Sequence, residues 1–140
     1  MTIELKKGAL RHQLLCRRVD GTITRASTND TLPLHDLAHY VVEKHLGLKN
    51  GFYGGIAKGF SIEELSDKEV IKTLPTEAMV AEVLTRNLQG LATPEGKVED
   101  FLELVRWEGE VLDLPMPNIP PEYVHEMGRQ LKELAEQWKN

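Results

Sequence analysis

The dipeptide Asp20-Gly21 lies between two short runs of strand-forming residues, and it constrains the fold of the N-terminal region more than any other feature. The flanking runs read HQLLCRRV and TITRAS. Asp-Gly between two such runs is a strong β-hairpin signal, because a two-residue type I′ turn needs residues that tolerate positive φ. We therefore expect a β-hairpin within residues 3–27, with residues 3–6 available as a third strand.

The first run of this hairpin also indicates which side of the sheet is buried. Side chains alternate between the two faces of a strand, so Leu10, His12, Leu14 and Cys16 share one face. Because three of these four side chains are apolar, we expect this face to pack against the rest of the chain and to carry His12 inward.

From residue 31 onward the apolar residues recur at helical spacing. Pro33 suits the first turn of a helix, and Gly47 suits the left-handed residue that ends one. Ser61 and Glu64 have the spacing of a capping box. The predicted helices cover residues 33–46, 61–68, 75–90, a segment after residue 93, and residues 123–138. The expected fold class is α+β and mostly helical, with the hairpin packed beside about five helices.

Length and composition limit the classes of protein that this chain can represent. Its 140 residues fit a single domain, 1–140, made of a hairpin region (3–27) and a helical region (31–140). No apolar run approaches the roughly 20 residues of a membrane span, and a net charge of -5 argues against nucleic-acid binding. A single cysteine excludes an internal disulfide and a multi-thiolate zinc site, which with the lack of a signal peptide predicts the cytoplasm.

The segment PLHDLAHYVVEKHLG carries the main candidate site. On a helix, His35, His39 and Glu43 form one row along the edge of the apolar stripe, with Asp36 beside them. Two histidines at positions i and i+4 are the arrangement by which one helix binds zinc. We therefore expect a zinc or other divalent-metal site with His35 and His39 as ligands, and with Glu43 as the third ligand or as a catalytic base.

The residue after the first histidine gives a weaker likeness to HExxH metallohydrolases. In that motif a glutamate acts as general base, and Asp36 occupies its position here with a side chain shorter by one methylene. Asp36 is accordingly a candidate base, or a group that orients His35. A further ligand from outside the helix is also expected. His12 on the inward strand face is the preferred candidate, and His125 on the last helix is the alternative.

Two other interpretations of the same residues stay open. In the first, the histidines form a structural polar network, and the chain binds a protein partner or a second copy of itself through its amphipathic C-terminal helix. In the second, His12, His35 and Asp36, with Asp67 or Asp100, imitate the metal ligands of HD-type phosphohydrolases. That fold is all-helical and needs the first histidine on a helix, whereas the Asp-Gly hairpin predicts a strand at His12.

Three strings in the first half of the chain, RRVDGTITR, LPLHDLAHYVVEKHLGL and GFYGGIAKG, resemble a family of small, uncharacterised bacterial proteins. The family shares the pattern HDLxHxxVE, LGL and GFxG, and the likeness covers about residues 10–60. It implies that His35, Asp36, His39 and Glu43 are distinctive residues of the family, and it implies no particular reaction. The glycines of GFYGGIAKG predict a tight turn packed under the preceding helix, with a loop that forms one wall of a pocket for a small molecule or peptide as the alternative.

Overall fold

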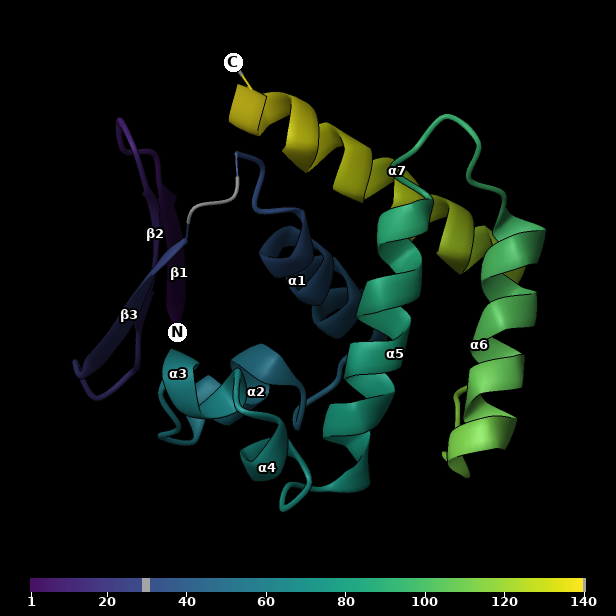
Figure 1. The fold of residues 1–140 in the computed structure, drawn as a ribbon, viewed down its shortest axis with the longest axis horizontal. Coiled ribbons are helices and arrows are strands. Elements are labelled where there is room, and N and C mark those ends of the chain that lie inside the picture. The colour runs from purple at the N-terminus through teal and green to yellow at the C-terminus, as the bar shows by residue number, and fades with distance from the viewer. Residues whose placement is uncertain (29–30, 140) are drawn as a thin grey trace.

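The computed structural model describes residues 1–28 and 31–139 (Figure 1). Its N-terminal part is a three-stranded antiparallel sheet in the order β1-β2-β3. The strands are β1 (Thr2–Lys6), β2 (His12–Arg17) and β3 (Ile23–Thr28). In the register, Ile3 pairs with Cys16 and Leu15 pairs with Arg25. The sequence-based expectation of a hairpin with an additional first strand is therefore confirmed.

The turn between β2 and β3 differs from the type I′ turn that we expected. Only Gly21 has a positive φ, of 90°, so Asp20 does not take the left-handed conformation. The N–H of Gly21 donates to the carbonyl of Arg18 at 3.0 Å, and the N–H of Arg18 donates to the carbonyl of Thr22 at 2.8 Å. Asp20 holds the turn through its side chain, which accepts hydrogen bonds from the N–H and the hydroxyl of Thr22. This is a three-residue loop in which glycine supplies the left-handed residue.

Seven helices follow in the part of the chain that the structure describes. They are α1 (Leu34–Leu46), α2 (Phe52–Ala57), α3 (Ile62–Leu65), α4 (Lys68–Ile71), α5 (Thr76–Gly90), α6 (Val98–Leu112) and α7 (Pro121–Lys139). The α+β, mostly helical fold class is confirmed. The end of α1 is also as expected, because Gly47 has a φ of 63° and donates its N–H to the carbonyl of Glu43. Ser61 and Glu64 form the expected capping box at α3.

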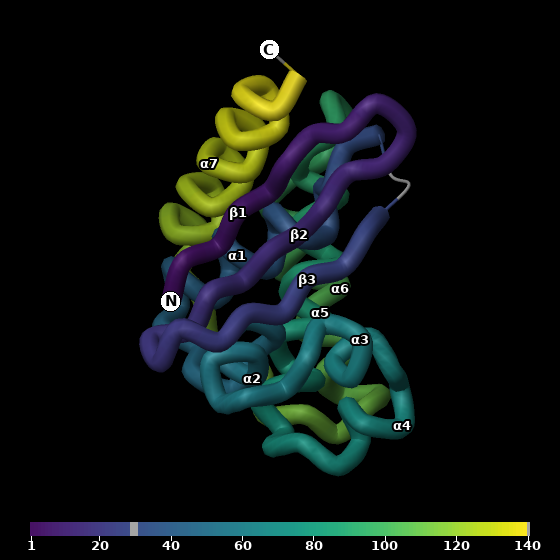
Figure 2. Tube along the Cα trace, turned by 90° about the vertical axis from the view of Figure 1, so that its left-hand side faces the viewer, coloured from purple at the N-terminus to yellow at the C-terminus, as the bar shows by residue number. Residues whose placement is uncertain are grey.

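Two apolar clusters hold the elements together. The larger one lies between α1, α5, α6 and α7, and Val41, Leu84, Met127 and Leu131 are fully buried in it. In Figure 1, α1 lies between the sheet and α5, and in Figure 2, which is seen from the sheet side, the strands lie in front of the helices. Burial of apolar surface in this cluster is the main contribution to the stability of the fold, at about 25 cal/mol for each Å² removed from water.

The smaller cluster joins the sheet to the short helices. It contains Leu14 and Cys16 of β2 and residues from α2 and α3. Tyr40 packs against both clusters, and so it ties α1 to the sheet side as well as to the helical side. Arg18 adds a polar tie, because its guanidinium donates to the carbonyls of Ile56 and Phe60 at 2.6 and 2.8 Å.

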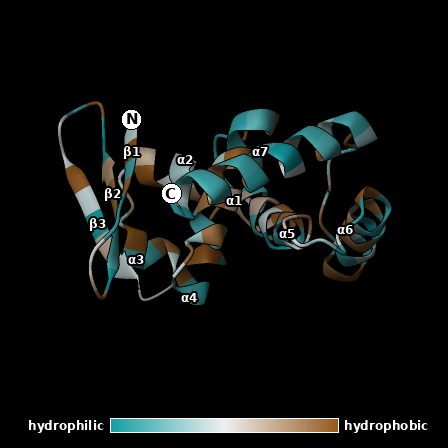
Figure 3. Ribbon diagram, turned by 90° about the horizontal axis from the view of Figure 1, so that it is seen from above, coloured by the Kyte–Doolittle hydropathy of each residue, from teal (hydrophilic) through white to brown (hydrophobic). Residues whose placement is uncertain are grey.

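One expectation about the inward strand face was wrong. Leu10 is 92% exposed, because β2 begins only at His12 and Leu10 belongs to the preceding turn. Figure 3 shows the hydropathy of the whole chain, with a largely hydrophilic surface along the outside of α7. Among the described residues, every helix is too short or too polar to cross a lipid bilayer.

Candidate metal centre

The row of side chains on α1 runs from the surface into the core. The His35 side chain is 49% exposed, whereas that of His39, one turn later, is only 1% exposed. Glu43 continues the row and its side chain is 6% exposed. Because these residues are four positions apart on a helix, their side chains form a line of polar groups, and one end of this line is in contact with solvent.

A second row of polar side chains, on α5, faces this line. Glu82, Thr85 and Gln89 follow one another at intervals of three and four residues, which places them on one side of a helix. Thr85 Oγ1 lies 3.3 Å from Nδ1 of His39. The side-chain amide of Gln89 lies 2.8 Å from Nδ1 of His35. The packing of α1 against α5 therefore brings two polar rows into contact inside an otherwise apolar interface.

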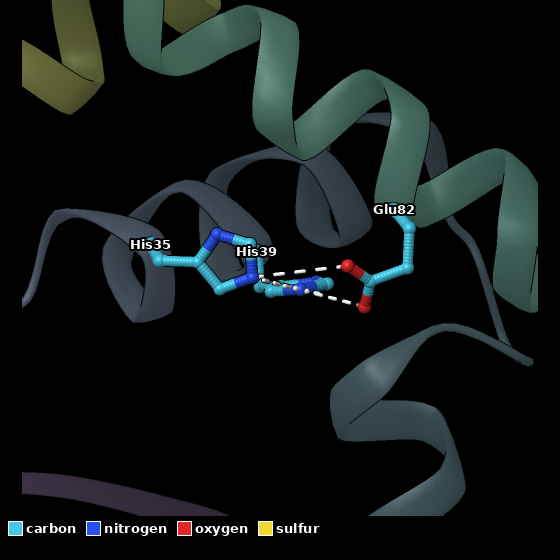
Figure 4. A group of neighbouring side chains, drawn as sticks. All are labelled: His35, His39 and Glu82. Atoms are coloured by element: carbon cyan, nitrogen blue, oxygen red, sulfur yellow. Dashed lines mark hydrogen bonds and ion pairs between the residues drawn. The ribbon is translucent and has the colours of Figure 1, made fainter. Parts of the chain in front are cut away.

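Three potential ligand atoms meet where the rows cross (Figure 4). The Nε2 atoms of His35 and His39 are 3.2 Å apart. The Glu82 carboxylate lies 3.1 Å from Nε2 of His39 and 3.7 Å from Nε2 of His35. The three residues offer ligand atoms that all lie within 4.8 Å of one another, which is close enough to hold a metal ion.

These separations can be compared with those of ligands around a tetrahedral ion. Zinc binds histidine nitrogen and carboxylate oxygen at about 2.0–2.2 Å, so two ligands at a tetrahedral angle lie roughly 3.3–3.6 Å apart. The two Nε2 atoms are 3.2 Å apart, and each lies near a different oxygen of Glu82, with Oε1 3.1 Å from His39 and Oε2 3.7 Å from His35. The three residues therefore approach the spacing that a shared ion needs, with one carboxylate oxygen next to each histidine.

The buried histidine has an unusual electrostatic environment. Burial by itself acts to lower the pKa of His39, but the hydrogen bonds to Glu43 and Glu82 outweigh it and raise the pKa to about 9. Burial acts to raise the pKa of Glu82, and the hydrogen bond to His39 reverses that effect and lowers the pKa below its ordinary value. His39 and Glu82 thus favour a cation between them, whether that cation is a proton or a metal ion.

Glu43 lies on the other side of the His39 ring. Its Oε2 atom is 3.1 Å from Nδ1 of His39, so this carboxylate accepts the proton of Nδ1 and directs Nε2 toward Glu82, where a metal ion would replace the second ring proton. The same carboxylate accepts hydrogen bonds from the backbone N–H groups of Phe52, Tyr53 and Gly54, at 2.8, 3.0 and 3.3 Å. These are the free N–H groups at the start of α2, where a negative charge is stabilised.

The structure therefore places Glu43 differently from our expectation. We expected Glu43 to be a third metal ligand or a base. The carboxylate that lies beside both Nε2 atoms is that of Glu82, and the Glu43 carboxylate instead binds the start of α2 and Nδ1 of His39. The glycine-rich segment, expected as a tight turn or a loop, forms α2 instead. Its approach to Glu43 requires Gly51, because a Cβ atom there would lie 2.4 Å from Cδ of Glu43.

A pocket of about 640 Å³ adjoins the three ligand atoms, and His35, His39 and Glu82 are part of its lining. Asp36 also lines this pocket. The backbone of Asp36 is held in place, because its carbonyl accepts a hydrogen bond of 2.9 Å from the Tyr53 hydroxyl. A volume of this size is typical of small-molecule binding sites.

The other expected ligands lie elsewhere. The ring of His12 packs edge-on against Trp138, with 4.9 Å between ring centroids, and its Nδ1 atom accepts the N–H of Gly8 at 3.3 Å. His12 is thus not part of the group formed by His35, His39 and Glu82. His125 is on the exposed surface of α7 and borders a different pocket.

The arrangement of an HD-type phosphohydrolase is not reproduced. His12 is on a strand, where that fold needs a helix. The Asp67 side chain accepts the N–H of Glu69 and so caps α4, and Asp100 is in the first turn of α6. Neither aspartate belongs to the group of ligand atoms around His39.

The residue that sequence reasoning missed is Glu82. It follows His39 by 43 positions and reaches it only because α5 packs against α1. A signal was present in the sequence, since Glu82, Thr85 and Gln89 form a polar row at helical spacing in a segment whose apolar residues predict burial. Such a row matches the spacing of His35 and His39 on the facing helix.

Comparison with known proteins gives no further guide, because no family model, no curated protein and no solved structure matches the chain.

Proposed function

We propose that the chain binds one divalent transition-metal ion, with zinc as the first candidate, through Nε2 of His35, Nε2 of His39 and the carboxylate of Glu82. The convergence of these groups carries this proposal, because one ligand atom from each of the three residues lies within 4.8 Å of the others. Two histidines and one glutamate form a ligand set that catalytic zinc sites use. The hydrogen bond between Nδ1 of His39 and the Glu43 carboxylate supports it further, since metal-binding histidines donate their other ring N–H to a carboxylate in this way.

We propose hydrolysis of a small molecule or peptide as the activity of this site. Three protein ligands leave a fourth position open, and His35, the most exposed of the ligands, connects that position to the pocket. A divalent ion held there would polarise a carbonyl or phosphoryl oxygen and lower the pKa of a coordinated water. Asp36, which lines the same pocket, is the candidate general base. Glu43 orients His39 and acts as a positioning residue.

The resemblance to the bacterial HDLxHxxVE family is consistent with this proposal. The histidines of the motif are the proposed ligands, and its glutamate, Glu43, is the group that orients the second of them. In this interpretation the first glycine of GFxG, Gly51, serves the same purpose, because it allows α2 to approach Glu43 closely. The resemblance indicates no substrate.

Hydrolysis of 4-nitrophenyl acetate tests the proposed activity. Zinc-loaded protein should release 4-nitrophenol faster than zinc in buffer, and excess EDTA should remove the difference. The His35→Ala variant should lose the activity, whereas His12→Ala should retain it, because His12 lies outside the ligand group. Equal rates for the zinc-loaded protein and for His35→Ala would contradict the proposal.

Binding of a protein partner, with the histidines serving as structure, is the second candidate. One observation favours it: Leu104, Trp107 and Val111 on α6 are exposed by 48, 59 and 62%, and their spacing of three and four residues places them on one side of the helix. The expected C-terminal helix is less suited, since Val124, Met127 and Leu131 of α7 are buried in the chain's own core. A protein that takes up no zinc would favour this candidate.

A further inference from the structure

Much of the lining of the pocket beside the candidate metal position is apolar. Leu14 comes from β2, Phe52 from α2, Ile71 from α4 and Met79 from the first turns of α5. Phe52, Ile71 and Met79 are only half-buried, so part of their apolar surface remains accessible. Surface of this kind favours an apolar ligand by roughly 25 cal/mol for each Å² that the ligand covers.

The charged groups of the pocket are separated by element. The acidic side chains, Asp36 and Glu82, are on α1 and α5, next to the candidate metal position. The basic ones, Lys68 and Lys72, are one helical turn apart at the two ends of α4. Lys72 has one ion pair, of 3.2 Å, with Glu69, and both partners are more than 60% exposed. An ion pair that is so exposed is weak, and it leaves Lys72 able to bind another anion.

The structure assigns a class of ligand to this pocket: we propose that it binds an apolar molecule that carries an anionic group. The apolar part would lie against Leu14, Ile71 and Met79, and the anionic group would face Lys68 and Lys72. This inference rests on the proposed function in one respect, because the bond to be hydrolysed would lie next to His35, His39 and Glu82. The ligand class itself follows from the lining and requires no metal.

An anionic group could instead bind the metal ion, so the test is made on metal-free protein. Isothermal titration calorimetry in the presence of EDTA compares octanoate with 1-octanol, which has the same chain length and no charge. Octyl phosphate, the third probe, distinguishes a preference for phosphate from one for carboxylate. Two exposed ion pairs are worth about 0.4–2 kcal/mol together, so the anions should bind roughly two- to thirtyfold more tightly than the alcohol.

Variants then locate the two parts of the ligand. Lys68→Gln/Lys72→Gln should weaken binding of the anions to the level of 1-octanol and leave 1-octanol unchanged. Lys132→Gln/Lys139→Gln is the matched control, because it removes the same charge from α7, away from this pocket. Ile71→Asp should weaken the binding of all three probes, since it removes part of the apolar lining. Ile71 is only half-buried, so the substitution is compatible with the fold.

The outcomes separate this inference from the proposed function. Equal affinities for octanoate, octyl phosphate and 1-octanol would overturn the anionic part of the inference, as would anion binding that the double lysine variant leaves unchanged. Absence of binding by every probe would overturn the whole inference. Because the probes are titrated without metal, a protein that binds octanoate but no zinc would contradict only the proposed metal site, and the reverse result would contradict only the ligand class.

Discussion

Nδ1 of His39 lies 3.1 Å from the carboxylate of Glu43, and Nε2 of the same ring lies 3.1 Å from the carboxylate of Glu82. The two carboxylates belong to different helices, α1 and α5, and they hold the imidazole between them. One of them is committed to the start of α2, and the other borders a pocket. This division separates a structural carboxylate from one that can bind a ligand.

Replacing Glu43 should destabilise the fold. Glu43→Ala removes one of the two carboxylates that pair with the buried His39 and leaves three backbone N–H groups without their acceptor, a loss of about 3–5 kcal/mol. Glu43→Gln keeps the shape but presents an NH₂ group to other donors, and it should lower the free energy of unfolding by about 1–3 kcal/mol. Urea unfolding measures both values. The exposed Glu63→Gln on α3 is the control, with an expected change below about 0.5 kcal/mol.

Two glycines in the chain should respond to alanine with opposite signs. Gly51→Ala would place Cβ 2.4 Å from Cδ of Glu43, so that α2 and Glu43 must move apart, at a cost of about 1–3 kcal/mol. Gly90→Ala, at the end of α5, has no atom within 4 Å of the new Cβ and should be neutral or stabilising by up to about 1 kcal/mol. Thermal unfolding of the two variants provides the comparison. Equal melting temperatures would show that the contact between Gly51 and Glu43 is not required.

The single cysteine should be unreactive at neutral pH. Burial, together with the nearby charge of Asp36, raises the pKa of the Cys16 thiol from 9.0 to about 11 against the opposing effect of Arg18. At pH 8 roughly one thiol in a thousand is then ionised, and Cys16 is fully buried. Iodoacetamide should label the native protein far more slowly than the urea-unfolded protein, as followed by mass spectrometry. Labelling of both forms at the same rate at pH 8 would contradict this environment.

The same shift has a consequence for stability at alkaline pH. The folded state holds the Cys16 proton more tightly than the unfolded state does. The protonated thiol therefore contributes fully to the free energy of unfolding below pH 9, and this contribution is lost as the pH rises from about 9 to about 11. Between these values the free energy of unfolding should fall less steeply in Cys16→Ala than in the unmodified protein. If the free energy of unfolding fell with pH at the same rate in both proteins, the pKa of the Cys16 thiol would not be raised in the folded state.

Local patterns were sufficient to predict much of the fold from the sequence. Gly47, at the end of α1, and the capping box of Ser61 and Glu64 each depend on residues within one helical turn, and both occur as expected. The prediction of a type I′ turn was wrong, because the side chain of Asp20 binds Thr22 and only Gly21 takes a positive φ. Helix α2 was missed because glycines are poor helix formers, and here the Glu43 carboxylate binds the N–H groups at its start.

The candidate site could be predicted only in part, because its residues come from two helices. His35 and His39 are one turn apart on α1, and the sequence contains that spacing directly. Glu82 becomes their neighbour through the packing of α1 on α5, which no local pattern specifies. His12 was placed correctly on a strand, but that strand directs it to Trp138 rather than to the histidines of α1.

The most direct test of the central claim is a zinc titration of the metal-free protein by calorimetry, with a competing chelator, together with Glu82→Gln and Glu43→Gln. Both substitutions remove one negative charge next to His39, but only Glu82 belongs to the ligand group. We expect one zinc ion per chain in the unmodified protein, no zinc binding in Glu82→Gln, and binding weakened by about 10–100-fold in Glu43→Gln. Zinc binding by Glu82→Gln as tight as that of the unmodified protein, or no zinc binding by the unmodified protein, would contradict the proposed site.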